Sequence, residues 1–467
     1  MDPLPCINNI DKMRDESTLS NSITNSGGMN ENKIKKSGDK IEQQQQQDAI
    51  PSTDDQTTEV LEEEPRNLLI SLLSELKIGV DLSKVPLPTF ILEPRSLLEK
   101  FTDFMIHGDL LCGVSKLQDP LDRIHQITKW YLSGFYFRPK GVKKPYNPIL
   151  GEIFRSRWDF GTNSNNNSSS SSSSSSNGNG NNNEGTTAFL VAEQISHHPP
   201  VSCVYISNRK DGYTMSGIIN PRSKFLGTSM AVIVDGSITL TLHEHQEEYV
   251  ITFPTAYARG ILFGTLLTEI CGSTSITCKN TQYKTELDFK SKPFFGGEYN
   301  VVTGKIKKKS ETFYQFSGKW DDRIDITNTK KKTTETFWDV SAQKRTPRIV
   351  RALQDQVENE SQRLWQKVTQ AIIKKDQKEA TVEKNRLEDE QRKSVRQRKE
   401  QNIDWEPKYF KKVGDQWVYK YSNTSLYSPS EPIEIEENGI IQFKNSSSSS
   451  SSFSSPSSSP NGANSPK

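Results

Sequence analysis

The pattern of apolar and polar positions begins with segments of helical and extended character. Leucines dominate residues 66–76, which predicts a short amphipathic or buried helix. Residues 87–94 are apolar and bracketed by prolines, so we expect them to be extended. A second helix is predicted from Ser96 through Phe104, and a third over about 120–136, where apolar residues recur at helical spacing.

The pattern changes to short alternating runs between about Lys144 and Asp339, separated by Gly, Pro, Asn or Asp. Runs with period two at regular spacing predict a large antiparallel sheet or barrel. A sheet this long is expected to close on itself. The runs are Gly151–Trp158, Thr187–Ala192, Ser202–Ser207, Tyr213–Ile218, Ser229–Val234, Ser237–Leu242, Glu248–Phe253, Ser275–Cys278, Tyr283–Phe289, Tyr299–Ile306 and Thr312–Phe316.

A helical pattern returns over residues 347–400 and is followed by an aromatic segment. Apolar residues recur there at steps of four or seven, and residues 377–399 are rich in charge and poor in apolar residues, which is typical of a solvated helix. Five aromatic side chains then follow, and we expect them to pack back on the body of the domain. They are Trp405, Tyr409, Phe410, Trp417 and Tyr419.

Composition separates a folded domain from two tails. Residues 1–64 are polar with a run of five glutamines, and the segment after about Asn445 is rich in Ser, Pro and Asn, so neither can bury enough apolar surface to offset its ordering entropy. We therefore expect a disordered tail over 1–64, a folded domain over 65–421 and a mostly disordered tail over 422–467. Residues 163–183 contain only Asn, Ser and Gly and are predicted to be an expanded hairpin tip, because lengthening a loop costs little.

Charge and cysteine content limit the possible partners and compartment. Lys and Arg number 60 against 58 Asp and Glu, a net charge of +2, which does not favour binding of nucleic acid. Five cysteines without framework spacing indicate a reducing compartment, so we expect a cytosolic protein. No signal peptide, lipidation signal or apolar run of 18 residues is present, so membrane contact is expected to be peripheral and transient. We expect a monomer.

The most distinctive motif is Glu193-Gln194-Ile195-Ser196-His197-His198-Pro199-Pro200. The prolines predict that the preceding strand breaks at the two histidines, because Pro cannot donate to a ladder. Two adjacent imidazoles suit an anion, since both can donate hydrogen bonds and carry charge near neutral pH. The alternatives are a purely structural turn and a metal site, and the latter is disfavoured by six histidines, no CxxC pair and no HExxH motif.

Two further constellations combine cations with hydrogen-bonding groups. In Lys143-Lys144-Pro145-Tyr146-Asn147-Pro148-Ile149-Leu150-Gly151-Glu152, prolines hold the backbone around Lys144 and Asn147, which suits either a headgroup rich in hydroxyls or a simple turn into a strand. Lys384, Glu388 and Arg392 are spaced by four residues and form one helical stripe about 12 Å long. The simpler interpretation of this stripe is two solvated salt bridges.

Together these motifs resemble the oxysterol-binding protein related family over roughly residues 66–420, and Gly318-Lys319-Trp320 and Trp405-Glu406-Pro407-Lys408-Tyr409-Phe410 look like further family landmarks. The resemblance implies a β-rich α+β fold, a near-closed antiparallel β-barrel around a lipid tunnel, with an N-terminal lid and helices and a C-terminal helical segment. It also implies that seven residues at the tunnel mouth grip the headgroup of phosphatidylinositol 4-phosphate. These are Lys144, Asn147, His197, His198, Lys384, Glu388 and Arg392.

The charges of these residues are consistent with that ligand. Two lysines, one arginine and a partly charged histidine pair can match a phosphomonoester and a phosphodiester. Glu388 does not suit a phosphate, so we expect it to bind inositol hydroxyls or to orient Lys384 or Arg392. The family lid should lie within residues 66–92, where apolar side chains would shield acyl chains from water. These are Leu68, Leu69, Leu72, Leu73, Phe90, Ile91 and Leu92.

The resemblance also predicts a non-enzymatic lipid-transfer protein without cofactor or bound metal. Residues 76–99 are similar to the family branch that carries phosphatidylserine, which we therefore expect as the second cargo. The alternatives are a sterol as second cargo, or a lipid-gated signalling adaptor. An enzyme is disfavoured: no GxSxG motif exists, and Cys203 and Arg209, although spaced as in a phosphatase loop, enclose a strand-like segment without Gly.

Overall fold

The structure is a computed structural model that describes residues 58–59, 63–82, 85, 87–139, 141–161, 185–261, 265–293 and 295–422. All of them belong to one compact unit, Thr53–Lys467. Regular structure begins earlier than the expected domain start at residue 65, since β1 covers Thr58–Glu59 and α2 covers Glu63–Ser74. Most of both expected tails and the tract 163–183 lie outside the described residues.

A single antiparallel sheet of 14 strands forms the body of the domain, with the order β16-β15-β14-β13-β12-β11-β10-β8-β7-β6-β5-β4, while β1 pairs with β11 and β9 pairs with β8 and β11. The strands are β4 Ile153–Phe160, β5 Thr186–His197, β6 Pro200–Asn208, β7 Tyr213–Phe225, β8 Met230–Leu242, β9 Glu247–Ile251, β10 Thr255–Arg259, β11 Leu266–Cys278, β12 Tyr283–Phe289, β13 Val301–Lys308, β14 Glu311–Lys319, β15 Arg323–Asn328 and β16 Thr333–Asp339.

The predicted β-rich α+β class is confirmed, but the sheet does not close by hydrogen bonds. Its path ends at β4 and β16, and no pairing between these two strands occurs among the described residues. The chain around Ile349 instead pairs with the free edge of β4. Arg157 and Ile349 exchange backbone hydrogen bonds of 2.9 and 2.8 Å. This segment falls at the start of residues 347–400, for which we expected helix.

That expectation is wrong for residues 347–360, which contain only the short 3₁₀ turn η7, Leu353–Asp355. Helices follow as α5 Ser361–Leu364, α6 Gln366–Ile373 and α7 Gln377–Glu400. The apolar spacing before residue 360 therefore reflects contacts of an extended segment, because tertiary pairing overrides a weak local periodicity. A 3₁₀ turn η6, Val340–Ala342, leads into this segment.

The N-terminal helices lie across the sheet. After the 3₁₀ turn η2 (Thr89–Ile91) and β2 (Leu92–Ser96) come α3 (Leu97–Lys100) and η3 (Phe101–Met105). Two further 3₁₀ turns, η4 (Gly108–Leu111) and η5 (Val114–Lys116), precede α4, Pro120–Ser133. Helix α4 begins where sequence rules place it, because Asp119 caps the helix by accepting from Leu121 N–H and Pro120 occupies the first turn.

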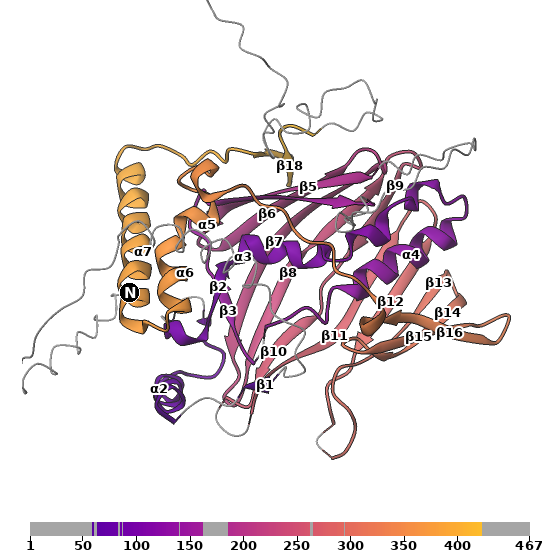
Figure 1. Cartoon of the computed structure of the whole chain (residues 1–467), viewed down its shortest axis with the longest axis horizontal. Coiled ribbons are helices and arrows are strands. Elements are labelled where there is room, and N and C mark those ends of the chain that lie inside the picture. Colours follow the sequence, from indigo (N-terminus) through magenta and orange to yellow (C-terminus); the bar gives the residue numbers. More distant parts are fainter. Residues whose placement is uncertain are drawn as a thin grey trace, which may run out of the picture. The chain divides into compact units, whose positions relative to one another are not determined.

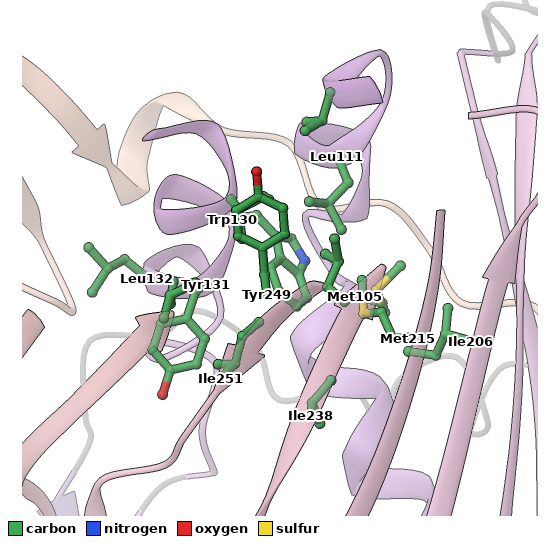
Figure 2. Packing of buried hydrophobic residues seen from close by; sticks show 14 of the residues in the cluster. Met105, Leu111, Trp130, Tyr131, Leu132, Ile206, Met215, Ile238, Tyr249 and Ile251 are labelled. Carbon is green, nitrogen blue, oxygen red and sulfur yellow. The ribbon is translucent and has the colours of Figure 1, made fainter. Parts of the chain in front are cut away.

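The main core lies between α4, the preceding helical turns and one face of the sheet. Figure 2 shows Trp130, Tyr131 and Leu132 of α4 close to Tyr249 and Ile251 of β9, and all five belong to one buried cluster. Figure 1 shows α4 over the strands near β12, and Thr128 of α4 is hydrogen-bonded to Thr285 of β12 at 2.7 Å. In the part of the chain that the structure describes, no helix is long and apolar enough to cross a membrane.

The aromatic closing segment packs back on the sheet, as predicted. It forms a small two-stranded sheet of β17, Phe410–Val413, and β18, Gln416–Tyr419. Tyr409, Phe410 and Tyr419 join a buried cluster with residues of β5 and β6. Glu193 of β5 accepts the backbone N–H groups of Lys408 and Tyr409 at 2.6 and 2.7 Å, which fixes the entry of this segment.

Candidate functional site

Lys144 and Asn147 lie in and beside a short strand that faces the C-terminal helices. Strand β3, Lys144–Tyr146, pairs in parallel with β2. Tyr146 anchors the strand, because its ring stacks on Trp365 with centroids 4.7 Å apart and its hydroxyl is 3.0 Å from the Thr369 hydroxyl. Lys144 and Asn147 are both half-buried beside this anchor.

A buried carboxylate holds the loop that follows Asn147. Glu152 is 0% exposed, and its Oε2 accepts from Ile149 N–H at 3.0 Å and from Trp365 Nε1–H at 2.9 Å. Its Oε1 accepts from the hydroxyls of Ser96 and Ser361. Burial raises the pKa of Glu152 and these four donors oppose the rise. The carboxylate thus ties the loop to β2 and to the helices α5 and α6.

The histidine pair lies at the turn between β5 and β6. The predicted strand break at the histidines is confirmed, because β5 ends at His197, which pairs with Pro200 across a two-residue turn. His197 Nδ1–H donates to the carbonyl of Pro148 at 2.9 Å, which joins this turn to the proline-rich loop. The rings of His197 and His198 meet edge to face with centroids 4.6 Å apart.

Helix α7 carries the third group of predicted residues. Lys384 Nζ lies 2.7 Å from Glu388 Oε1, and Arg392 Nη1 lies 4.0 Å from Glu388 Oε2. The stripe is therefore formed, but the stronger contact of Arg392 is with Asp389, at 2.5 Å. Lys384 has a side-chain exposure of 17% and Arg392 of 59%, so the stripe runs from a sheltered end to an open end.

The charges of the proline-rich loop, the histidine turn and helix α7 act on one another, so these three segments lie close together. Burial lowers the pKa of Lys144, the charge of Lys384 lowers it further, and Glu388 opposes both. Burial also lowers the pKa of His197, the Pro148 carbonyl opposes this, and the charges of His198, Glu388 and Arg392 act on it as well. Asn147 precedes Pro148, whose carbonyl accepts from His197 Nδ1–H, so it belongs to the loop that this hydrogen bond joins to the histidine turn.

This arrangement is suited to an anion. Two half-buried groups, Lys144 and His197, have their charged forms disfavoured by burial. An anion bound close to both would stabilise those charged forms and accept hydrogen bonds from them. Glu388 pairs with Lys384, one of the two cations that we expect it to orient, and this role stays a prediction.

Sequence reasoning missed two side chains that lock the site together. Gln391 of α7 accepts from Leu150 N–H at 3.1 Å, and the ring of Trp405 lies so close to Gly151 that a Cβ there would be 2.5 Å away. Gln391 lies one residue before Arg392 in a helix of polar residues, so no pattern distinguishes it. Trp405 was expected to pack on the body, but its target could not be read from the sequence.

The predicted lid residues do not share one environment. Leu69 and Leu73 of α2 are each 1% exposed, in a cluster of apolar residues from β7, β8, β10 and β11. Leu72 and Phe90 are half-buried, and Phe90 packs against this same cluster. In contrast, Leu68 is 56% exposed, Ile91 is buried in η2, and Leu92 packs with Trp365 and Leu387 beneath α6 and α7.

A small apolar pocket opens beside α2. It has a volume of about 340 Å³ and lies between the end of the helix and the tip of the β7–β8 hairpin. Its lining includes Leu73, Leu76, Ile78 and Phe225. Thr89 of η2 donates to the Gln377 side chain at 2.5 Å, so the segment after α2 also contacts the first turn of α7, the helix that carries Lys384, Glu388 and Arg392.

Comparison with known proteins connects this site to a family. The family model described as "Oxysterol-binding protein" matches residues 71–372 and 367–428. The chain is 65% identical over 396 residues to oxysterol-binding protein 4 of Dictyostelium discoideum, covering 83% of this chain and 80% of that protein. It is 42% identical to human oxysterol-binding protein-related protein 8, again over 83% of this chain but only 42% of the relative's length.

Solved structures show the same fold. The Osh1 ORD domain in complex with ergosterol has a TM-score of 0.59 at 22% identity, covering 75% of this chain and 86% of that one. The Osh3 ORD in complex with PI(4)P from Saccharomyces cerevisiae has a TM-score of 0.56 at 22% identity, covering 75% and 89%. The predicted family is confirmed by the family model and by both relatives, and the chain belongs to the oxysterol-binding protein family.

Proposed function

We propose that the chain is a lipid-transfer protein that binds one lipid at a time and carries it between membranes. The observation that supports this most is the convergence of Lys144, His197 and the Lys384–Glu388–Arg392 stripe, which come from three distant segments of the sequence. The ligand headgroup is that of phosphatidylinositol 4-phosphate. Its phosphomonoester carries close to two negative charges at neutral pH, which matches the cations gathered here.

The second cargo in this proposal is phosphatidylserine, exchanged against the phosphoinositide. The apolar cluster that holds Leu69 and Leu73 provides a covering element for acyl chains, since α2 contacts the sheet mainly through these two leucines. The protein acts as a monomer in the cytosol and contacts membranes transiently. A sterol in place of phosphatidylserine is the alternative that the experiment below distinguishes.

The proposal includes no catalytic step. The alternative nucleophile, Cys203, lies inside β6 with 1% exposure, and burial and the charge of Glu193 raise the pKa of its thiol. A buried neutral thiol within a strand is a poor nucleophile. Incubation of the phosphoinositide with the protein should therefore release no inorganic phosphate.

The experiment measures extraction of three lipids from liposomes by the full chain: phosphatidylinositol 4-phosphate, phosphatidylserine and a sterol. His197→Ala/His198→Ala should reduce extraction of the phosphoinositide about tenfold or more, because hydrogen bonds to charged groups are lost. The matched control is His243→Gln/His245→Gln in the β8–β9 turn, which removes two imidazoles at the other end of the strands and should leave extraction unchanged.

The outcomes separate the components of the proposal. Equal extraction by the wild type and by His197→Ala/His198→Ala would show that the histidine pair does not bind the headgroup. Extraction of sterol rather than phosphatidylserine would replace the second cargo. A wild-type chain that extracts none of the three lipids would contradict lipid transfer and favour a signalling adaptor.

A further inference from the structure

Three hairpin turns lie side by side at the end of the sheet that is opposite the headgroup site. They are residues 279–282, 308–311 and 329–332. Adjacent strand pairs join them: Tyr283 pairs with Lys308, and Tyr314 pairs with Asn328. Thr329 closes the row, because its hydroxyl donates to the carbonyl of Thr312 at 2.6 Å.

These turns carry six lysines and one carboxylate, Glu311, and we refer to them as the lysine rim. Five of the six lysines are exposed, and Lys308 is half-buried. Two of the turns place a lysine in the left-handed region, Lys309 with φ 53° and Lys332 with φ 56°. The rim lysines are Lys279, Lys308, Lys309, Lys330, Lys331 and Lys332.

The surroundings of the rim leave this charge uncompensated overall. Glu311 is paired with Lys330 at 2.7 Å. Glu286, further along the sheet, is surrounded by Lys284, Lys305 and Lys307 at 2.7 to 3.4 Å, and its contacts with Lys307 and Lys284 lower its pKa to about 2. The neighbouring β8–β9 turn contributes one exposed carboxylate, Glu244. Asp119 and Asp122 at the start of α4 are also exposed and close enough to act on Tyr283. Six lysines against these two carboxylates, Glu311 and Glu244 still leave a local excess of two positive charges.

The strand directions separate the rim from the headgroup site. His197 lies at the β5–β6 turn, at one end of the sheet. The antiparallel pairing of β6, β7, β8 and β9 places the β8–β9 turn at the opposite end. Strands β11, β12 and β13 continue the pairing, and their turns in the lysine rim lie at that same end. Strand β7 alone has 13 residues, which at roughly 3.3 Å per residue spans about 40 Å. In Figure 1, α7 and the β13–β16 hairpins lie at opposite sides of the sheet.

We propose that the lysine rim docks on a bilayer whose surface carries anionic phospholipids. Lysine ammonium groups on flexible stems at the tips of a row of turns can reach many laterally mobile headgroups at once. The contact lies well beyond one Debye length from the headgroup site, so it holds the protein on a surface without occupying the lipid site. Docking by the rim does not depend on the proposed lipid exchange.

The chemistry of the rim favours a bilayer over nucleic acid. Nucleic-acid surfaces commonly combine arginine with exposed aromatic rings on which bases stack. The rim contains no arginine, and lysine ammonium groups lie over two neighbouring rings: Lys308 Nζ is 4.8 Å from the Tyr283 centroid and Lys330 Nζ is 5.0 Å from the Phe313 centroid.

The test is co-sedimentation of the full chain with vesicles of phosphatidylcholine, with or without about 30% phosphatidylglycerol. The rim variant is Lys279→Gln/Lys309→Gln/Lys331→Gln/Lys332→Gln. The matched control removes the same charge from four other exposed lysines: Lys374→Gln/Lys378→Gln/Lys411→Gln/Lys412→Gln. Binding to anionic vesicles should fall at least about tenfold in the rim variant and less than about twofold in the control.

Two further variants distinguish membrane docking by the rim from a folding defect and from the proposed lipid exchange. Changing the same four rim lysines to arginine should retain binding, which distinguishes lost charge from lost folding. His197→Ala/His198→Ala should bind the vesicles like the wild type, so that failure of the lipid-exchange proposal leaves this result unaffected. Equal losses in the rim and control variants, no binding by the wild type, or tighter binding of a single-stranded oligonucleotide at the same salt concentration would each overturn the inference.

Discussion

At the scale of single residues, His107 is a buried imidazole that the fold keeps neutral. It is 1% exposed, its Nε2 lies 2.8 Å from the Tyr136 hydroxyl, and its ring meets Trp338 edge to face at 4.9 Å. Burial, and then the charge of Arg345, lower its pKa from 6.5 to about 4, and a backbone hydrogen bond with Lys344 opposes them. Protonation of His107 is therefore less favourable in the folded state than in the unfolded chain.

This pKa shift predicts a dependence of stability on pH. Between pH 6.5 and about 4 the unfolded chain binds a proton at this position that the folded chain does not, so the free energy of unfolding falls as the pH falls through that window. His107→Gln, which cannot titrate, should make this dependence shallower by up to about 1.4 kcal/mol per pH unit. Urea unfolding at several pH values measures this slope, and identical slopes for both proteins would contradict the prediction.

Single residues of the site were predictable only where a motif marked them. The two histidines, Lys144 and the stripe on α7 were found from short sequence patterns, and the structure brings them together. The network around Glu152 was not found, because its donors come from residues 96, 149, 361 and 365, and their meeting depends on the packing of β2 against α5 and α6.

At the scale of elements, the loop after Asn147 depends on Gly151. This glycine has φ +79°, its N–H donates to the Gln194 carbonyl at 2.9 Å, and the Trp405 ring lies directly over it. A methyl group at residue 151 would lie 2.5 Å from two ring carbons of Trp405. The loop that carries Asn147 and the segment that carries Trp405 therefore fit together only with glycine at this position.

Gly151→Ala should destabilise the fold and weaken phosphoinositide extraction, because both the left-handed backbone and the ring contact are affected. The conformational part costs roughly 1 kcal/mol, and displacement of Trp405 adds to it. In a Trp405→Ala background the same substitution should cost less, with a coupling of about 0.5–3 kcal/mol. Chemical unfolding of the four proteins of this cycle gives the coupling, and additive effects would mean that the ring contact contributes nothing.

Elements were predicted best where alternation was strong. The run 283–289 matches β12 residue for residue, whereas two expected strands merge into β8, since Gly236 with φ 114° continues the ladder where we expected a turn. Strands β15 and β16 were missed because each has only two apolar residues: Ile324 and Ile326 in β15, and Phe337 and Trp338 at the end of β16. Residues 89–91 form a 3₁₀ turn rather than the expected extended segment. The hydrogen bond from the Thr89 hydroxyl to the Gln377 side chain of α7 favours this turn.

At the scale of the whole molecule, α2 is attached to the sheet through a separate apolar cluster. Leu69 and Leu73 pack with Phe225, Met230 and Leu266, and this cluster is distinct from the main core beneath α4. Because α2 has only 12 residues and one buried side, its attachment depends on few contacts. Local opening of α2 should therefore require less free energy than unfolding of the sheet.

Leu69→Ala/Leu73→Ala should release α2 while the sheet stays folded. Each buried leucine contributes about 2–5 kcal/mol, and this loss falls mainly on the local opening of the helix. Amide hydrogen exchange should accelerate over residues 63–82 and along β10, and remain slow in β12. Leu68→Ala is the control, because Leu68 is 56% exposed on the same helix and its truncation should leave exchange unchanged. If exchange instead accelerates uniformly, α2 belongs to the cooperative unit of the sheet and cannot open separately.

A helix that opens alone would give a lipid a route to the sheet without unfolding the domain. The Leu69→Ala/Leu73→Ala variant should then also lose a bound lipid to acceptor vesicles faster than the wild type does.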